Sequence, residues 1–157
     1  MSNSIIKKRN VLYIVMMILI GIYMSFIWWH STLTADESSL ESAAVLEFMT
    51  RFLKSIGFTA ELTDHIIRKS AHFCEFALLG LLTIWCGWLK NHRLIRNFTT
   101  AGFVCLGTSV VDELVQIGSK GRSAEVTDVA LDFCGAVSGV IFFIIIISIV
   151  KIFRKAK

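Results

Sequence analysis

Several ionisable residues of this sequence stand at the borders of apolar segments, at spacings that suit chemistry. Lys69, His72 and Glu75 are three residues apart, so a helix would carry their side chains on neighbouring stripes of one side. An imidazole and a carboxylate at this spacing could hold a divalent cation, and a lysine beside them could contact phosphate. The spacing therefore indicates a polar site at the start of a helix.

A second group of polar residues follows later in the chain. Asp112 and Gln116 are four residues apart, so they can point inward from one helix face. Asp128 and Asp132 have the same spacing, and Arg122 lies in the short turn between the two pairs. The candidate ligand-binding residues are Lys69, His72, Glu75, Asp112, Glu113, Gln116, Arg122, Asp128 and Asp132.

Membrane-spanning helices have to position these residues. Of the 157 residues, 55% are hydrophobic and 18% are charged, whereas soluble domains carry roughly a quarter charged residues. Four apolar segments, at about residues 11–29, 71–89, 98–117 and 129–150, are long enough to span a bilayer. The sequence predicts an all-α fold, a four-transmembrane-helix bundle that forms a single membrane domain over residues 1–157.

Lysines and arginines predict the orientation of this bundle. They cluster before the first span, between the second and third spans, and after the fourth span. Because cytoplasmic loops carry the excess of lysine and arginine, both termini are predicted to be cytoplasmic. Such short clusters also exclude a nucleic-acid partner, despite the formal net charge of +4.

The same orientation places the polar residues at the outer ends of three helices. On the inner side of Glu75, and likewise of Asp112, the helix has only ~14 uncharged residues, which span ~21 Å at ~1.5 Å each. The hydrocarbon core is thicker, at ~30 Å. Both carboxylates would then lie below the outer interface, where charge is costly unless paired, and this favours a functional site. The alternative is a structural network that holds the helices in register.

Two further patterns concern the rest of the architecture. Ser38 and Glu41 have capping-box spacing ahead of an amphipathic stretch at 39–56, which we expect to form a helix on the outer membrane surface or across the bundle. The alternative is a helix that only caps the bundle. Gly135 and Gly139 form a GxxxG pattern that favours packing inside the bundle over a homodimer. The four cysteines lack CxxC spacing and are expected to be buried hydrophobic residues.

Several motifs in order resemble those of the VanZ-like family. The matching segments are 68–76 (RKSAHFCEF), 112–116 (DELVQ), 121–122 (GR) and 128–135 (DVALDFCG). They fit the patterns K-x-x-H-F-x-E-[FY], D-E-x-x-Q, G-R and D-x(3)-[DN]-x(2)-G over about residues 69–139. The resemblance implies a bacterial multi-pass protein of the cell membrane, and the family's namesake is associated with teicoplanin resistance.

Two positions depart from the family pattern. Lys120 stands where members usually have a proline, and Asp132 stands where they usually have an asparagine. The second departure adds a carboxylate to the site.

Three functions fit these residues. The first is a cell-envelope protein whose outer pocket binds a lipid headgroup or a lipid-linked cell-wall component, with Lys69 and Arg122 on phosphate. By analogy with the namesake, such a pocket could be linked to glycopeptide resistance. The second is a metal-dependent membrane enzyme acting on a lipid phosphate. The third is a small dimeric transporter, against which the one-sided placement of the charges counts.

The enzyme hypothesis needs a divalent metal as its cofactor. Candidate catalytic residues are His72, Glu75, Asp112 and Glu113, with Glu113 or Asp132 as the base. Candidate metal ligands are His72, Glu75, Asp112 and Asp128. No HExxH spacing is present to assign a zinc site.

Overall fold

The computed structural model describes residues 3–57 and 62–155, which fold into five helices without a strand. The helices are α1 (Asn3–His30), α2 (Ala35–Ser55), α3 (Asp64–Lys90), α4 (Leu94–Ile117) and α5 (Val126–Lys155). All except α2 are long and apolar enough to span a membrane. The all-α fold with four spans is confirmed. The spanning helices continue past the predicted apolar runs because intrahelical hydrogen bonds also satisfy the backbone of the flanking polar residues.

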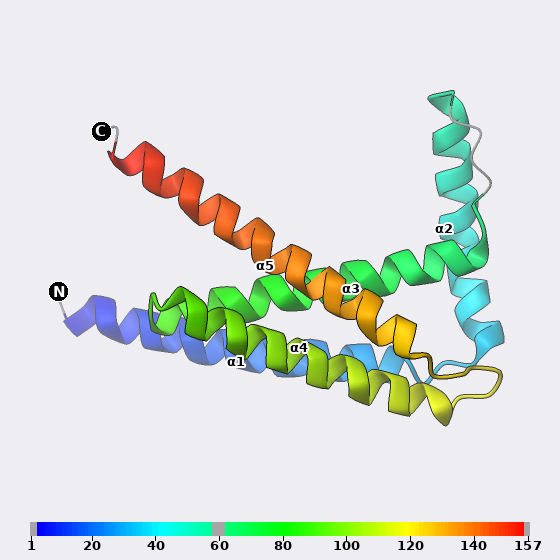
Figure 1. Ribbon diagram of the computed structural model, residues 1–157, viewed down its shortest axis with the longest axis horizontal. Coiled ribbons are helices and arrows are strands. Elements are labelled where there is room, and N and C mark those ends of the chain that lie inside the picture. Colours follow the sequence, from blue (N-terminus) through cyan, green and yellow to red (C-terminus); the bar gives the residue numbers. More distant parts are fainter. Residues whose placement is uncertain (1–2, 58–61, 156–157) are drawn as a thin grey trace.

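The four long helices alternate in direction, so that both termini lie at one end of the bundle (Figure 1). At the opposite end, which we call the distal end, lie α2 and the turn between α4 and α5 (Figure 1). The candidate residues at the start of α3, the end of α4 and the start of α5 therefore share the distal end.

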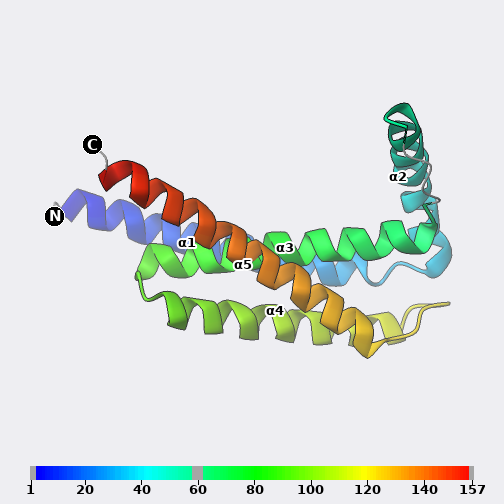
Figure 2. The same cartoon turned by 45° about the horizontal axis from the view of Figure 1, so that its top comes forward.

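Helix α3 is the centre of the bundle. It contacts each of the other four helices and packs most extensively on α5. The two helices cross in both views (Figures 1 and 2), and glycines allow them to approach closely. A Cβ added at Gly135 would overlap the carbonyl oxygen of Phe73, and one added at Gly139 would overlap that of Ala77. The GxxxG pattern thus packs α5 on α3, and this face is not free for a second chain.

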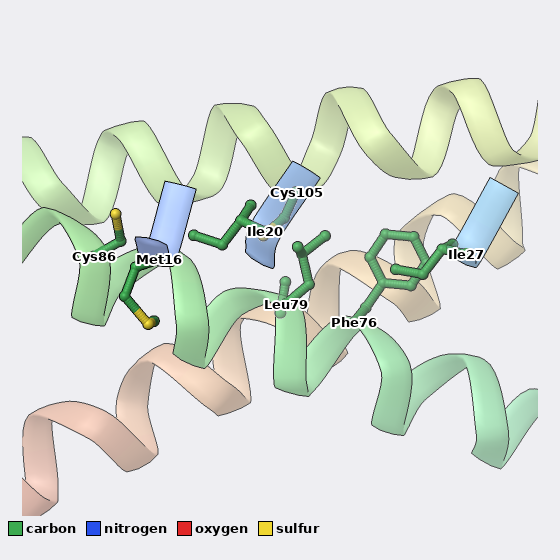
Figure 3. Close-up of a cluster of buried hydrophobic side chains, with 8 residues drawn as sticks. Met16, Ile20, Ile27, Phe76, Leu79, Cys86 and Cys105 are labelled. Atoms are coloured by element: carbon green, nitrogen blue, oxygen red, sulfur yellow. The ribbon is translucent and has the colours of Figure 1, made fainter. Parts of the chain in front are cut away.

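Apolar side chains of α1, α3, α4 and α5 form the larger core cluster (Figure 3). Ile27, Phe76 and Leu79 in this cluster are completely buried. The buried cysteines are Cys86 and Cys105, and the exposed ones are Cys74 and Cys134. The expectation of burial was wrong for the second pair, because an apolar residue of a spanning helix can face lipid instead of the interior.

Helix α2 begins four residues earlier than its expected start. Its capping box is formed by Thr34 and Glu37, not by Ser38 and Glu41. The Thr34 amide and hydroxyl donate to the Glu37 carboxylate, and they lower the pKa of that group. Within the described part of the chain, α2 packs mainly against α3, contacts α1 through the pair of Glu41 and His30, and projects sideways from the distal end (Figure 1). Its apolar residues, among them Phe48, are largely exposed, as on a helix that lies on a membrane surface.

Candidate functional site

The distal ends of α3, α4 and α5 deliver a histidine and two carboxylates to one point. One ligand atom from each of His72, Asp112 and Asp132 lies within 4.8 Å of the other two. We call these three residues the His–Asp–Asp cluster. Asp112 is completely buried and Asp132 is 1% exposed, so water screens neither carboxylate well. His72 is partly buried, and its Nδ1 is 3.8 Å from Oδ2 of Asp112.

Neighbouring polar side chains orient Asp112. Its Oδ1 accepts a hydrogen bond from the Ser31 hydroxyl at 2.6 Å, and its Oδ2 accepts one from Nε2 of Gln116 at 3.0 Å. Ser31 directly follows α1, whereas Gln116 lies one turn beyond Asp112 on α4. The contact with Ser31 therefore connects the first spanning helix to the cluster. Ser31 was not among the predicted residues, because serine is common at helix ends and its spacing carries no signal.

Asp132 has a less complete set of partners. Its Oδ2 accepts a hydrogen bond from the Ser109 hydroxyl of α4 at 2.8 Å. Its Oδ1 is buried and has no hydrogen-bond partner within residues 3–57 and 62–155. A buried carboxylate oxygen without a donor is unfavourable, because nothing replaces the water that it loses. The position is thus suited to a cation or a proton.

Asp128 lies apart from the His–Asp–Asp cluster and pairs with a lysine. Nζ of Lys69 is 2.5 Å from Oδ1 of Asp128 and 3.9 Å from Oε2 of Glu125. The charge of Lys69 is therefore largely balanced within the protein. Sequence spacing placed Lys69 beside phosphate and Asp128 among the metal candidates, but the structure joins the two residues to each other.

Glu75 and Glu113 also lie outside the cluster. A carboxylate oxygen of Glu75 is 3.5 Å from Nδ1 of His30, and Nε2 of the same histidine contacts Glu41 at 3.0 Å. His30, to which the sequence assigned no role, thus bridges α2 and α3 from the end of α1. Glu113 is buried and accepts a hydrogen bond from the backbone amide of Glu125, so it anchors the α4–α5 turn.

Arg122 is held by uncharged groups. Its guanidinium donates to the carbonyl oxygen of Ser31 at 3.4 Å and to the hydroxyl of Ser38 at 3.1 Å. It forms no ion pair with a carboxylate in the described ranges, and Asp128 pairs with Lys69 instead. Gly121, with φ of +78°, allows the turn that directs Arg122 toward α2. Burial and the neighbouring Arg68 lower the pKa of the Arg122 guanidinium.

Two adjacent cavities open at the distal end. The polar cavity has a volume of about 150 Å³ and is lined by His65, Arg68, Lys69, His72, Gln116, Gly121, Arg122, Ser123, Glu125 and Asp128. The second, mainly apolar cavity has a volume of about 350 Å³ and lies between α2 and α3, with lining residues that include Val45, Met49 and Ile67. Arg68 and His72 line both cavities. A charged pocket thus adjoins an apolar one.

Comparison with known proteins identifies the family. No curated protein and no solved structure matches the chain significantly. The family model described as VanZ/LLP1 matches residues 11–148. The match includes the four spanning helices almost completely, together with every residue of the site described above. The chain is therefore a multi-pass, all-helical membrane protein that belongs to the VanZ/LLP1 family.

Proposed function

We propose that this protein acts in the bacterial cell envelope by binding the phosphate-bearing headgroup of a lipid or lipid-linked cell-wall component at its distal, outer end. The observation that carries the proposal is Arg122 in the polar cavity. Its side chain is half-buried and faces a carbonyl and a hydroxyl instead of a carboxylate. A desolvated positive charge without an anion is unfavourable, so the cavity favours an anionic ligand.

The wall of the cavity suits a phosphate-bearing ligand. Arg68 and Arg122 both line it, and guanidinium groups bind phosphate oxygens through paired hydrogen bonds. Lys69 is already paired with Asp128, and Nε of Arg68 is 3.5 Å from Oδ2 of Asp64, so Arg122 carries most of the phosphate recognition that the sequence assigned in part to Lys69. Glu125 and Asp128 on the same wall would accept hydrogen bonds from amine or hydroxyl groups of a headgroup.

The apolar cavity supports an amphiphilic ligand over free phosphate. It begins at the residues that border the polar cavity and continues between α2 and α3. A headgroup held by Arg122 would leave its acyl or polyprenyl chain beside Val45, Met49 and Ile67. A protein that binds an envelope lipid in this way would alter membrane-surface chemistry, which is our basis for extending the proposal to glycopeptide (teicoplanin) resistance.

Native mass spectrometry of the detergent-purified protein can test this proposal with phosphatidylglycerol, phosphatidylcholine and inorganic phosphate as separate probes. We expect wild-type protein to bind phosphatidylglycerol most tightly and inorganic phosphate weakly. Loss of one charged hydrogen-bonding group costs about 1.5–3 kcal/mol, so Arg122→Gln should weaken phosphatidylglycerol binding about ten- to hundredfold. Arg122→Lys should recover only part of it, because lysine lacks the planar fork.

The matched control is Lys120→Gln. Lys120 is exposed in the same turn, and its substitution removes the same charge as Arg122→Gln. Lys120 does not line the polar cavity. Its substitution should leave binding unchanged. An equal loss in both variants would indicate attraction to the general positive charge of this end, and full binding by Arg122→Gln would exclude the proposed site. Equal affinity for inorganic phosphate and phosphatidylglycerol would show that the site binds phosphate alone and would contradict a lipid ligand.

A further inference from the structure

The His–Asp–Asp cluster has the composition and arrangement of a cation site. We propose that His72, Asp112 and Asp132 bind one divalent cation between α3, α4 and α5. The inference does not rest on the proposed lipid function, because it is argued only from the three cluster residues and their hydrogen-bond partners. The set also differs from the ligands expected from sequence spacing, because Glu75 and Asp128 have other partners and Asp132 replaces them.

Charge balance is the first argument. Asp112 and Asp132 bring two buried carboxylates together, and two such groups repel each other unless a cation or a proton lies between them. In the described part of the chain, neither is ion-paired with a lysine or arginine, and the nearest basic group is His72 at 3.8 Å from Asp112. A divalent cation would balance both carboxylates while the imidazole remained neutral.

The unpartnered oxygen of Asp132 is the second, independent argument. Asp132 belongs to the cluster and is almost completely buried, yet its Oδ1 has no donor within the residues that the structure describes. The other oxygen takes the hydroxyl of Ser109. A structural network would be expected to supply a donor to each oxygen, as Ser31 and Gln116 do for Asp112. A cation bound by Asp132 would satisfy this carboxylate.

The geometry requires a modest contraction. Protein ligands bind Zn²⁺ at about 2.0–2.2 Å, so two ligand atoms of a tetrahedral site are about 3.3–3.6 Å apart. The cluster atoms lie within 4.8 Å of one another, so movements of up to about 1 Å would complete the site. Ser31, Gln116 and Ser109 orient the two carboxylates by hydrogen bonds, as outer partners do around protein metal sites.

The donor set indicates the class of ion. One imidazole nitrogen with two carboxylate oxygens suits Zn²⁺ or Mn²⁺ and lacks the thiolates that select softer ions. Three protein ligands leave at least one coordination position open. His72 and Gln116 also line the polar cavity, so the open position can be reached from it by water or by an anionic oxygen.

Mn²⁺ titration followed by electron paramagnetic resonance tests the proposal directly. Chelator-treated wild-type protein in detergent, without added phosphate or phospholipid, should bind one Mn²⁺ per chain. Asp132→Asn removes the charge of one ligand and keeps the shape of the side chain. It should weaken Mn²⁺ binding at least about tenfold, because loss of a residue that only hydrogen-bonds to a metal ligand already lowers metal affinity about tenfold or more. Asp36→Asn makes the same change at an exposed position of α2 and should bind as wild type does.

His72→Gln provides a second ligand variant in case Asp132→Asn does not fold, and circular dichroism establishes the helical content of each sample. The proposal is overturned if wild-type protein takes up no stoichiometric Mn²⁺. It is also overturned if folded ligand variants bind Mn²⁺ as tightly as wild type, or if Asp36→Asn loses binding to the same degree. Because no lipid is present, failure here leaves the phosphatidylglycerol result unaffected, and the converse also holds.

Discussion

Removal of the Ser31 hydroxyl should destabilise the bundle through Asp112. The hydroxyl donates to Oδ1 of Asp112 at 2.6 Å, and both residues are completely buried. A hydrogen bond to a charged acceptor contributes about 1.5–3 kcal/mol, compared with about 1 kcal/mol for a neutral pair. Ser31→Ala should therefore lower the free energy of unfolding by about 1.5–3 kcal/mol. The Ser31 carbonyl, which accepts from Ser119 and Arg122, is retained in this variant.

A double-mutant cycle separates this hydrogen bond from general effects of the substitution. Asp112→Asn keeps the shape of the side chain but removes its charge and one of its two acceptor oxygens. With Asp112 already changed, Ser31→Ala should cost less than it does in wild-type protein. The difference, about 1 kcal/mol or more, is the coupling energy of residues in direct contact.

Unfolding by sodium dodecyl sulfate in mixed micelles, monitored by tryptophan fluorescence and circular dichroism, measures these free energies. Ser25→Ala is the matched control, because the Ser25 hydroxyl is exposed and bonds only within its own helix, to the carbonyl of Gly21. Its substitution should change stability by less than about 0.5 kcal/mol. Additive effects of Ser31→Ala and Asp112→Asn would refute the reasoning, as would a Ser31→Ala effect no larger than that of Ser25→Ala.

Two further predictions concern the topology and the packing of the bundle. In a Cys-free background, a cysteine at position 121 should react with an impermeant reagent in intact cells, whereas one at position 93 should not. The reason is that the lysine and arginine bias predicts cytoplasmic termini. Labelling at position 93 would show that the orientation is the reverse of the predicted one. Gly139→Leu should destabilise the protein by about 1–3 kcal/mol or more, since its side chain would overlap the α3 backbone, whereas Gly107→Leu, which meets open space, should be tolerated in the same unfolding assay.

Hydropathy alone predicted the four spanning helices, because an apolar segment of bilayer length has no stable alternative to a helix in lipid. The order of the spans along the chain also predicted that the polar residues gather at one end of the bundle. The start of α2 was less predictable. Thr34 and Ser38 both precede a glutamate by three residues, but in the structure Thr34 caps the helix and the Ser38 hydroxyl accepts a hydrogen bond from Arg122.

Only the tertiary structure decided which polar groups are partners. Spacing along the chain left Asp128 and Asp132 equivalent, but the structure pairs Asp128 with Lys69 and places Asp132 beside His72. The difference depends on how each helix is rotated about its axis and where it crosses its neighbours. Those quantities are set by the close contact of Gly135 and Gly139 with the α3 backbone, a long-range packing effect that residue spacing does not encode.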